Sequence, residues 1–139
     1  MDPETLEEIV RDSPLLAGLS GEARADLLAR LEPVLLSGGE TLTREGDEAD
    51  ALYLVIGGRL QVSIERDGEQ VLIGFIGRGE LVGEMALVTR EPRTATVRAL
   101  RDTQLLRLGA QAFTDIVAEH PEALRAVSGT IVARHVRSF

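Results

Sequence analysis

The chain has 139 residues, no cysteine and a formal net charge of −8, with 15 Lys and Arg against 23 Asp and Glu. The length fits one domain over residues 1–139, and the lack of cysteine excludes disulfides, thiolate metal sites and cysteine nucleophiles. The acidic balance argues against a nucleic-acid partner, because that binding depends on neutralising phosphates.

The N-terminal part has helical periodicity, at about residues 4–31. A short helix is expected at about residues 4–11, before Pro14, and a second one at about 21–31, with Ser20 as its N-cap. The first residues are acidic and lack the basic start and apolar run of a signal peptide, and no apolar stretch reaches about 18 residues. We therefore expect a cytoplasmic chain that does not insert into a membrane.

From about residue 33 to residue 108 the apolar period changes to two, and turn residues recur, which is typical of a β-sandwich or barrel. Gly58 and the pair Asp67-Gly68 mark hairpin turns, and the latter pair suits a type I′ turn. Gly74 interrupts a strand and indicates a bulge or a close approach to the backbone. Seven or eight antiparallel strands are expected, among them residues 51–56, 60–64, 71–76, 94–100 and 103–108.

Two helices are expected at about residues 110–137, the second beginning at Pro121. His120 directly precedes this proline, which favours a role at the helix boundary over metal binding. The apolar stripe of the last helix, from Leu124 to Val132, suits core packing, a lid or a homodimer surface. The helices are expected to pack against one roll-like β-sandwich.

The residues at 82–97 carry groups suited to anion binding. Gly83 permits a tight turn, and residues 84–87 can form one helical turn whose free amides attract anions. The guanidinium of Arg93 presents a planar fork of donors that matches phosphate oxygens. These groups can enclose one phosphate and leave Glu84 to accept a hydrogen bond from a neighbouring hydroxyl.

This stretch resembles the phosphate-binding cassette of cyclic nucleotide-binding domains. The family pattern begins with an apolar residue, Gly-Glu, a small residue and an aliphatic residue. After a gap it continues with Arg, a small residue, Ala, any residue and an aliphatic residue. Residues 82–97 meet every position of this pattern. Residues 46–58 resemble a second family pattern, with Thr43 departing from an aliphatic position; we expect that departure to concern a strand and not the pocket.

The resemblance covers about residues 13–136 and implies the fold. That fold belongs to the α+β class and is mainly β. It is an eight-stranded antiparallel β-roll, which is jelly-roll-like and is also called a double-stranded β-helix. N-terminal helices and two C-terminal helices flank the roll. By resemblance, Glu84 binds the ribose 2′-hydroxyl, Arg93 pairs with the cyclic phosphate, and the amides of Met85 and Ala86 complete the cradle.

Thr94 occupies the place where cyclic-GMP-dependent protein kinases carry a threonine that reaches the guanine amino group. Members that prefer cyclic AMP also carry Ser or Thr there, so the expected ligand is cAMP or cGMP. Two residues on strands that face the presumed pocket are expected to form an apolar wall against the base. The complete expected ligand-binding set is Val62, Ile73, Gly83, Glu84, Met85, Ala86, Arg93, Thr94 and Ala95.

Finer similarity, in residues 13–19, 98–102 and 132–134, is to the regulatory domains of neuropathy target esterase and bacterial patatin-like phospholipases. Residues 126–129 lack the first glycine of a nucleophile elbow, so no esterase site is expected. The sequence thus predicts a non-catalytic sensor without metal or cofactor, which relays ligand binding through its C-terminal helices to an effector domain or protein, for example a patatin-like phospholipase.

The alternative that stays open is a degenerate β-roll that serves as a scaffold or interaction module and binds no nucleotide. A cupin-like metalloenzyme would need several histidines on strands, whereas His120 and His135 fall near the C-terminal helices. The acidic residues at 45–50 are expected to be solvated and to shape a turn. We also expect Arg93 to lack a charge partner until a ligand supplies one.

Overall fold

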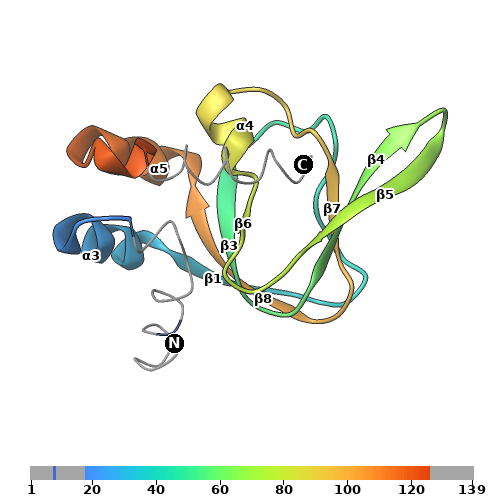
Figure 1. Cartoon of the computed structure of the whole chain (residues 1–139), viewed down its shortest axis with the longest axis horizontal. Coiled ribbons are helices and arrows are strands. Elements are labelled where there is room, and N and C mark those ends of the chain that lie inside the picture. Colours follow the sequence, from blue (N-terminus) through green and yellow to red (C-terminus); the bar gives the residue numbers. More distant parts are fainter. Residues whose placement is uncertain (1–7, 9–17, 126–139) are drawn as a thin grey trace.

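The computed structural model of the chain describes residue 8 and residues 18–125. Its strands form two four-stranded antiparallel sheets that face each other (Figure 1). The first sheet has the order β1 (Glu32–Leu36), β8 (Thr103–Gly109), β3 (Ala51–Gly57) and β6 (Leu81–Val82). The second has the order β2 (Thr41–Thr43), β7 (Thr96–Ala99), β4 (Leu60–Arg66) and β5 (Glu69–Ile76). The predicted eight-stranded antiparallel roll is confirmed.

Three helices accompany the sheets in the described part of the chain: α3 (Gly21–Arg30), α4 (Glu84–Thr89) and α5 (Ala110–Glu119). Helices α3 and α5 lie together at one end of the molecule, and the β4–β5 hairpin projects at the other (Figure 1). Residues 122–125 begin the second predicted C-terminal helix. The predicted helix at about 4–11 and the continuation to residue 137 lie outside the described residues, apart from Glu8, which is helical. None of the described helices is long and apolar enough to cross a bilayer.

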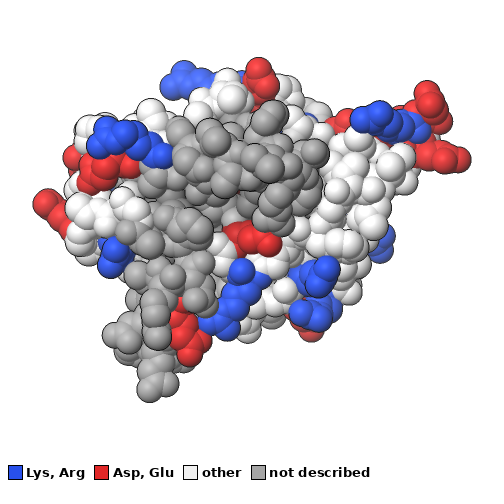
Figure 2. Space-filling view, viewed as in Figure 1, with Lys and Arg blue, Asp and Glu red and all other residues white. Residues whose placement is uncertain are grey.

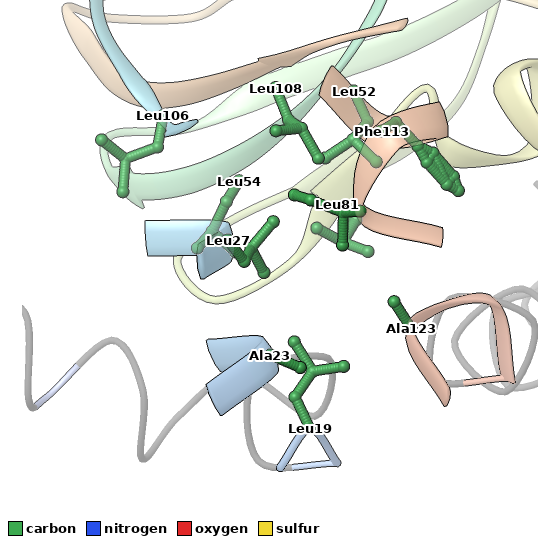
Figure 3. Close-up of a cluster of buried hydrophobic side chains, with 11 residues drawn as sticks. Leu19, Ala23, Leu27, Leu52, Leu54, Leu81, Leu106, Leu108, Phe113 and Ala123 are labelled. Carbon is green, nitrogen blue, oxygen red and sulfur yellow. The ribbon is translucent and has the colours of Figure 1, made fainter. Parts of the chain in front are cut away.

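Strand β3 is buried on both faces, which explains its unbroken apolar sequence. Leu52 and Leu54 point toward α3 and α5 and join a cluster with Leu27 and Ile116 (Figure 3). The alternate residues, such as Tyr53, pack between the two sheets in a second cluster. The first sheet, with β3 in it, therefore separates a helix-covered core from the interior of the roll.

The predicted turns are present with the backbone geometry that their residues favour. Asp67 and Gly68 both have positive φ, 51° and 83°, as a type I′ turn requires. The register between β4 and β5 shifts so that Gly74 faces Val62 and Ile73 is the extra residue. The bulge expected at Gly74 therefore exists, and it turns Ile73 toward the inner side of the sheet, where it packs against the inter-sheet cluster.

Polar side chains join helix α3 to the C-terminal end of helix α5. Ser20 caps α3, with its Oγ accepting from the amide of Ala23 at 3.2 Å, as predicted. His120 is the C-cap of α5, and its Nε2 lies 3.2 Å from Oδ2 of Asp26 on α3. The other oxygen of Asp26 accepts from Nε of Arg30 at 2.9 Å. The boundary role expected of His120 is confirmed.

The Asp26 contacts predict an acid-dependent contribution to stability. The hydrogen bond from Arg30 holds the pKa of Asp26 below its ordinary value, with smaller contributions from the Arg30 charge and His120. A carboxylate with a lowered pKa stabilises the fold above the unfolded-state pKa, and this contribution is lost as the pH falls through the folded-state pKa. We expect Asp26→Asn to lower the Tm slightly at pH 7 and to lower it less at pH 3, which is below the unfolded-state pKa of about 3.9. Thermal unfolding followed by circular dichroism at both pH values measures this, with Glu69→Gln as the exposed control; an equal deficit at both pH values would refute the assignment.

Candidate functional site

A cavity of about 260 Å³ opens at the end of the roll interior, between α4 and the second sheet. Four of the residues that line the cavity also belong to the inter-sheet core, namely Val62, Ile76, Val82 and Val97. The cavity therefore continues that core toward the surface. Its complete lining is Thr43, Val62, Ile64, Ile73, Ile76, Val82, Gly83, Glu84, Ala86, Arg93, Thr94, Ala95 and Val97.

Every residue predicted for the site except Met85 lines this one cavity. The backbone of Met85 lies in the first turn of α4, beside the cavity residues Glu84 and Ala86. Thr94 is exposed at the mouth, whereas Val62 is buried. The structure thus gathers the predicted residues, and their roles toward a ligand stay predictions.

Gly83 forms the turn from β6 into α4. It is the N-cap of α4 and has a left-handed φ of 79°, a conformation that other residues adopt with strain. A Cβ at this position would overlap Nη1 of Arg93, and it would lie 2.9 Å from Cζ of the same side chain. Glycine is therefore required twice, for the backbone turn and for the close approach of the guanidinium.

Arg93 is 5% exposed and its guanidinium is held by main-chain oxygens. Nη2 donates to the carbonyl of Ala51 at 2.6 Å, and Nη1 donates to the carbonyl of Gly83 at 3.0 Å. Nη2 also lies 3.4 Å from Oδ1 of Asp50. The expectation that Arg93 has no partner of its own is therefore wrong, because carbonyls at the start of β3 and before α4 already satisfy a buried charge that would be costly alone.

The loop of residues 44–50 is fastened to the same arginine. The amide of Arg93 donates to the carbonyl of Asp47 at 2.8 Å, and the amide of Gly46 donates to the carbonyl of Arg93 at 2.8 Å. The exposed Asp50 lies between two guanidinium groups, because its Oδ2 is 3.7 Å from Nη2 of Arg107. The acidic loop does shape a turn, as expected, and one of its carboxylates also contacts the site.

Glu84 is the first residue of α4 and is 1% exposed. Its carboxylate lies at the positive end of this short helix and lines the same cavity as Arg93. The cavity therefore combines a buried donor fork, a buried acceptor and aliphatic walls. Such a site suits a compact ligand with an anionic group, a hydroxyl and an apolar face.

Thr43 corrects one sequence expectation. It lies on strand β2, as expected, but it is 9% exposed and lines the cavity. Sequence analysis also missed Asp50 and the walls Ile64, Ile76, Val82 and Val97. The alternation of residues 60–64 would have found Ile64, because it falls on the same strand face as Val62.

A second, larger cavity of about 530 Å³ lies on the other side of α4. It is lined by apolar residues of α5, including Phe113 and Val117, by the loop at Gly46 and by the separate loop at Pro92. Ala86 lines both cavities, so the short helix α4 is the wall between them.

One group of described residues has ligand atoms close enough for a metal, namely Asp26, Glu119 and His120, within 4.8 Å of one another. The guanidinium of Arg30 already lies there, 2.9 Å from Asp26 and 4.0 Å from Glu119. This cation supplies the positive charge, so we assign the group to the contact between α3 and α5.

Residues 33–120 match the model of a family described as the cyclic nucleotide-binding domain. Lysophospholipase nte1 of Neurospora crassa is 34% identical over 144 residues, covering 97% of this chain and 9% of that protein. The regulatory domain of Toxoplasma gondii PKA, in a co-crystal with cAMP, is 33% identical with a TM-score of 0.78, over 84% of this chain and 46% of that one. The N-terminal domain of a transcriptional regulator from Streptomyces coelicolor A3(2) is 37% identical with a TM-score of 0.75, over 94% and 91%. These matches confirm the predicted fold and the predicted resemblance.

The contact between Gly83 and Arg93 predicts a large effect of one added methyl group. We expect Gly83→Ala to lower the free energy of unfolding by about 3 kcal/mol, because it strains the backbone and displaces hydrogen bonds of a buried cation. Gly68→Ala is the matched control, since Gly68 has a φ of 83° and nothing within 4 Å of an added Cβ. It should cost only about 1–2 kcal/mol. Urea denaturation measures both, and equal losses would show that the approach of Arg93 is unimportant.

Proposed function

Because this chain belongs to the cyclic nucleotide-binding domain family, we propose that its 260 Å³ cavity binds a cyclic nucleoside monophosphate, cAMP or cGMP. The domain is a binding module and not an enzyme. Occupancy of the cavity would then regulate an effector through the C-terminal helices.

The observation that carries the proposal is the burial of Glu84 and Arg93, 1% and 5% exposed, in one cavity with apolar walls. A cyclic phosphate would meet the guanidinium of Arg93 and the amides of Met85 and Ala86. The ribose 2′-hydroxyl would donate to the carboxylate of Glu84. The ring-closed diester holds its phosphate and hydroxyl at a fixed separation, which suits two groups fixed in a folded cassette.

The base would contact the second sheet. Val62 and Ile73, with Ile64 beside them, offer aliphatic surface along the β4–β5 hairpin. Thr94 stands exposed at the mouth, where its hydroxyl can meet an edge of the base. A threonine hydroxyl both donates and accepts, so it suits adenine and guanine alike and leaves both cyclic nucleotides as candidates.

The path to an effector would run through α4. Because Ala86 lines the binding cavity and the 530 Å³ cavity against α5, a shift of α4 toward the phosphate changes the space beside Phe113 and Val117. The matched relative is named a lysophospholipase, and this chain spans about a tenth of its length. We therefore propose a lipid-hydrolysing effector such as a patatin-like phospholipase, in the cytoplasm.

One observation favours the alternative of a scaffold that binds no nucleotide. The fork of Arg93 already donates to the carbonyls of Ala51 and Gly83. An anion must therefore add a contact to this guanidinium or replace one of the two. Titration decides between the two functions.

Calorimetric titration of the purified chain with cAMP, cGMP and 5′-AMP tests the proposal. We expect a cyclic nucleotide to bind and 5′-AMP to bind at least tenfold more weakly. Arg93→Lys keeps the charge but loses the planar fork, so the affinity should fall at least tenfold, about 1.4 kcal/mol. Arg101→Lys, at an exposed arginine outside both cavities, should leave the affinity unchanged. No heat and no Tm shift with either cyclic nucleotide at millimolar concentration would favour the scaffold.

The role proposed for Glu84 is tested by removing the hydroxyl from the ligand. We expect the wild type to bind 2′-deoxy-cAMP at least tenfold more weakly than cAMP, because a hydrogen bond to a buried carboxylate is lost. Glu84→Gln should bind cAMP more weakly and discriminate less between the two ligands, as a double-mutant cycle requires. If Glu84→Gln keeps the full discrimination, the 2′-hydroxyl binds elsewhere. Glu69→Gln, outside the cavity, serves as the control.

A further inference from the structure

Two threonines are buried in the described part of the chain, Thr43 and Thr103, and they differ in their hydrogen bonds. The hydroxyl of Thr103 donates to the carbonyl of Arg101 at 2.8 Å and accepts from the amide of Arg59 at 3.2 Å. The hydroxyl of Thr43 has no hydrogen-bond partner among the residues that the structure describes. A buried hydroxyl of this kind is uncommon, because it gives up hydrogen bonds to water without replacing them, so its position needs an explanation.

The hydroxyl of Thr43 is accessible from the ligand cavity. Thr43 is 9% exposed, and it is one of the residues that line the 260 Å³ cavity. Its hydroxyl oxygen is not fully enclosed by protein atoms. The residues beside it in the same row of the second sheet, Val97 and then Val62, are aliphatic. Thr43 therefore places one hydroxyl in a part of the cavity wall that is otherwise apolar.

Thr43 lies on the side of the cavity that carries Arg93. In the second sheet, β7 separates β2 from the β4–β5 hairpin. The chain that leaves β2 runs beside the chain that enters β7, because the amide of Glu45 donates to Oγ1 of Thr96 at 3.0 Å. The amide of Gly46 donates to the carbonyl of Arg93 at 2.8 Å. Thr43 is thus across β7 from the hairpin, at the end of the segment that is fastened to Arg93.

The hairpin side of the cavity offers only apolar side chains. The lining residues on β4 and β5 are Val62, Ile64, Ile73 and Ile76. Figure 2 shows uncharged surface along the length of the hairpin and charged side chains at its far end. This side suits the apolar face of a base, so the anionic group of the same ligand would lie on the opposite side, with Arg93 and Thr43.

We propose that the hydroxyl of Thr43 donates a hydrogen bond to an exocyclic phosphate oxygen of the bound cyclic nucleotide. The inference rests on the proposed function and adds a residue to it. A hydroxyl that lacks a partner in the described protein gains an anionic acceptor, which makes a stronger bond than a neutral one. Arg93 already donates to the carbonyls of Ala51 and Gly83. A second donor beside it adds a phosphate contact that requires neither of these bonds to break.

Calorimetric titration of the full chain with cAMP and cGMP tests the proposal. Thr43→Val removes the hydroxyl and keeps the shape, so the affinity for both nucleotides should fall about tenfold and by the same factor. Thr43→Ser keeps a hydroxyl and should bind much like the wild type. Thr41→Val is the matched control, on the same strand but outside the cavity lining, and it should leave the affinity unchanged.

Two outcomes of this titration separate the inference from the proposed function. If the wild type binds and Thr43→Val binds equally well, the role of Thr43 is overturned and the proposed function stands. If the wild type binds neither nucleotide, both are overturned. A loss that is confined to one of the two nucleotides would place the contact on the base and would also overturn the assignment.

Phosphorothioate analogues of cAMP locate the contact on the phosphate. In each of the two diastereomers, sulfur replaces a different exocyclic oxygen, and sulfur is a weak acceptor. We expect Thr43→Val to lose less affinity for one diastereomer than for cAMP, because the contacted oxygen is already absent from that analogue. An equal loss for cAMP and for both diastereomers would show that the hydroxyl does not contact the phosphate.

Thermal unfolding without nucleotide distinguishes a ligand contact from a structural role. Thr43→Val breaks no hydrogen bond of the described protein, so it should not lower the Tm. Thr103→Val is the contrasting variant, because it removes the bonds to Arg59 and Arg101 and should lower the Tm by several degrees. If Thr43→Val lowers the Tm as much as Thr103→Val does, the hydroxyl is structural and the proposal is overturned.

Discussion

The structure depends above all on how the buried guanidinium of Arg93 is satisfied. Its donors bind the carbonyls of Ala51, at the start of β3, and Gly83, at the turn into α4, and its backbone pairs with residues 46–47. One residue thus fixes the loop before β3, the start of that strand and the start of the short helix. A charge of this kind is stable in the interior only with such partners, so the cassette is ordered by its own main chain.

This arrangement has two opposite effects on the proposed binding of an anion. The donors that would face a phosphate are already oriented, and little conformational freedom is lost when they engage it. The same contacts would compete with the anion for the guanidinium. The affinity would therefore depend on how much stronger a hydrogen bond the guanidinium makes to a phosphate oxygen than to a carbonyl oxygen. A charged acceptor is the stronger one, which favours the phosphate.

Much of this could be predicted from sequence, because it rests on local patterns. Gly83 and Arg93 at their spacing indicated the cassette, and the two-residue periodicity indicated the sheets. The prediction that Thr43 lies away from the pocket was wrong, because the pairing of β2 with β7 shifts between Thr41 and Thr43. A shift of one residue changes the face of the sheet on which a side chain lies. The carbonyl partners of Arg93 had no sequence signature, since every residue offers the same backbone oxygen.

Helix α4 has six residues and lies between two cavities, and its buried residue Ala86 lines both of them. Any larger side chain at this position would intrude on both spaces at once. A substitution at residue 86 would therefore alter the proposed ligand site and the space beside α5 together, and a change meant for only one of the two cavities has to be made at a residue that lines that cavity alone.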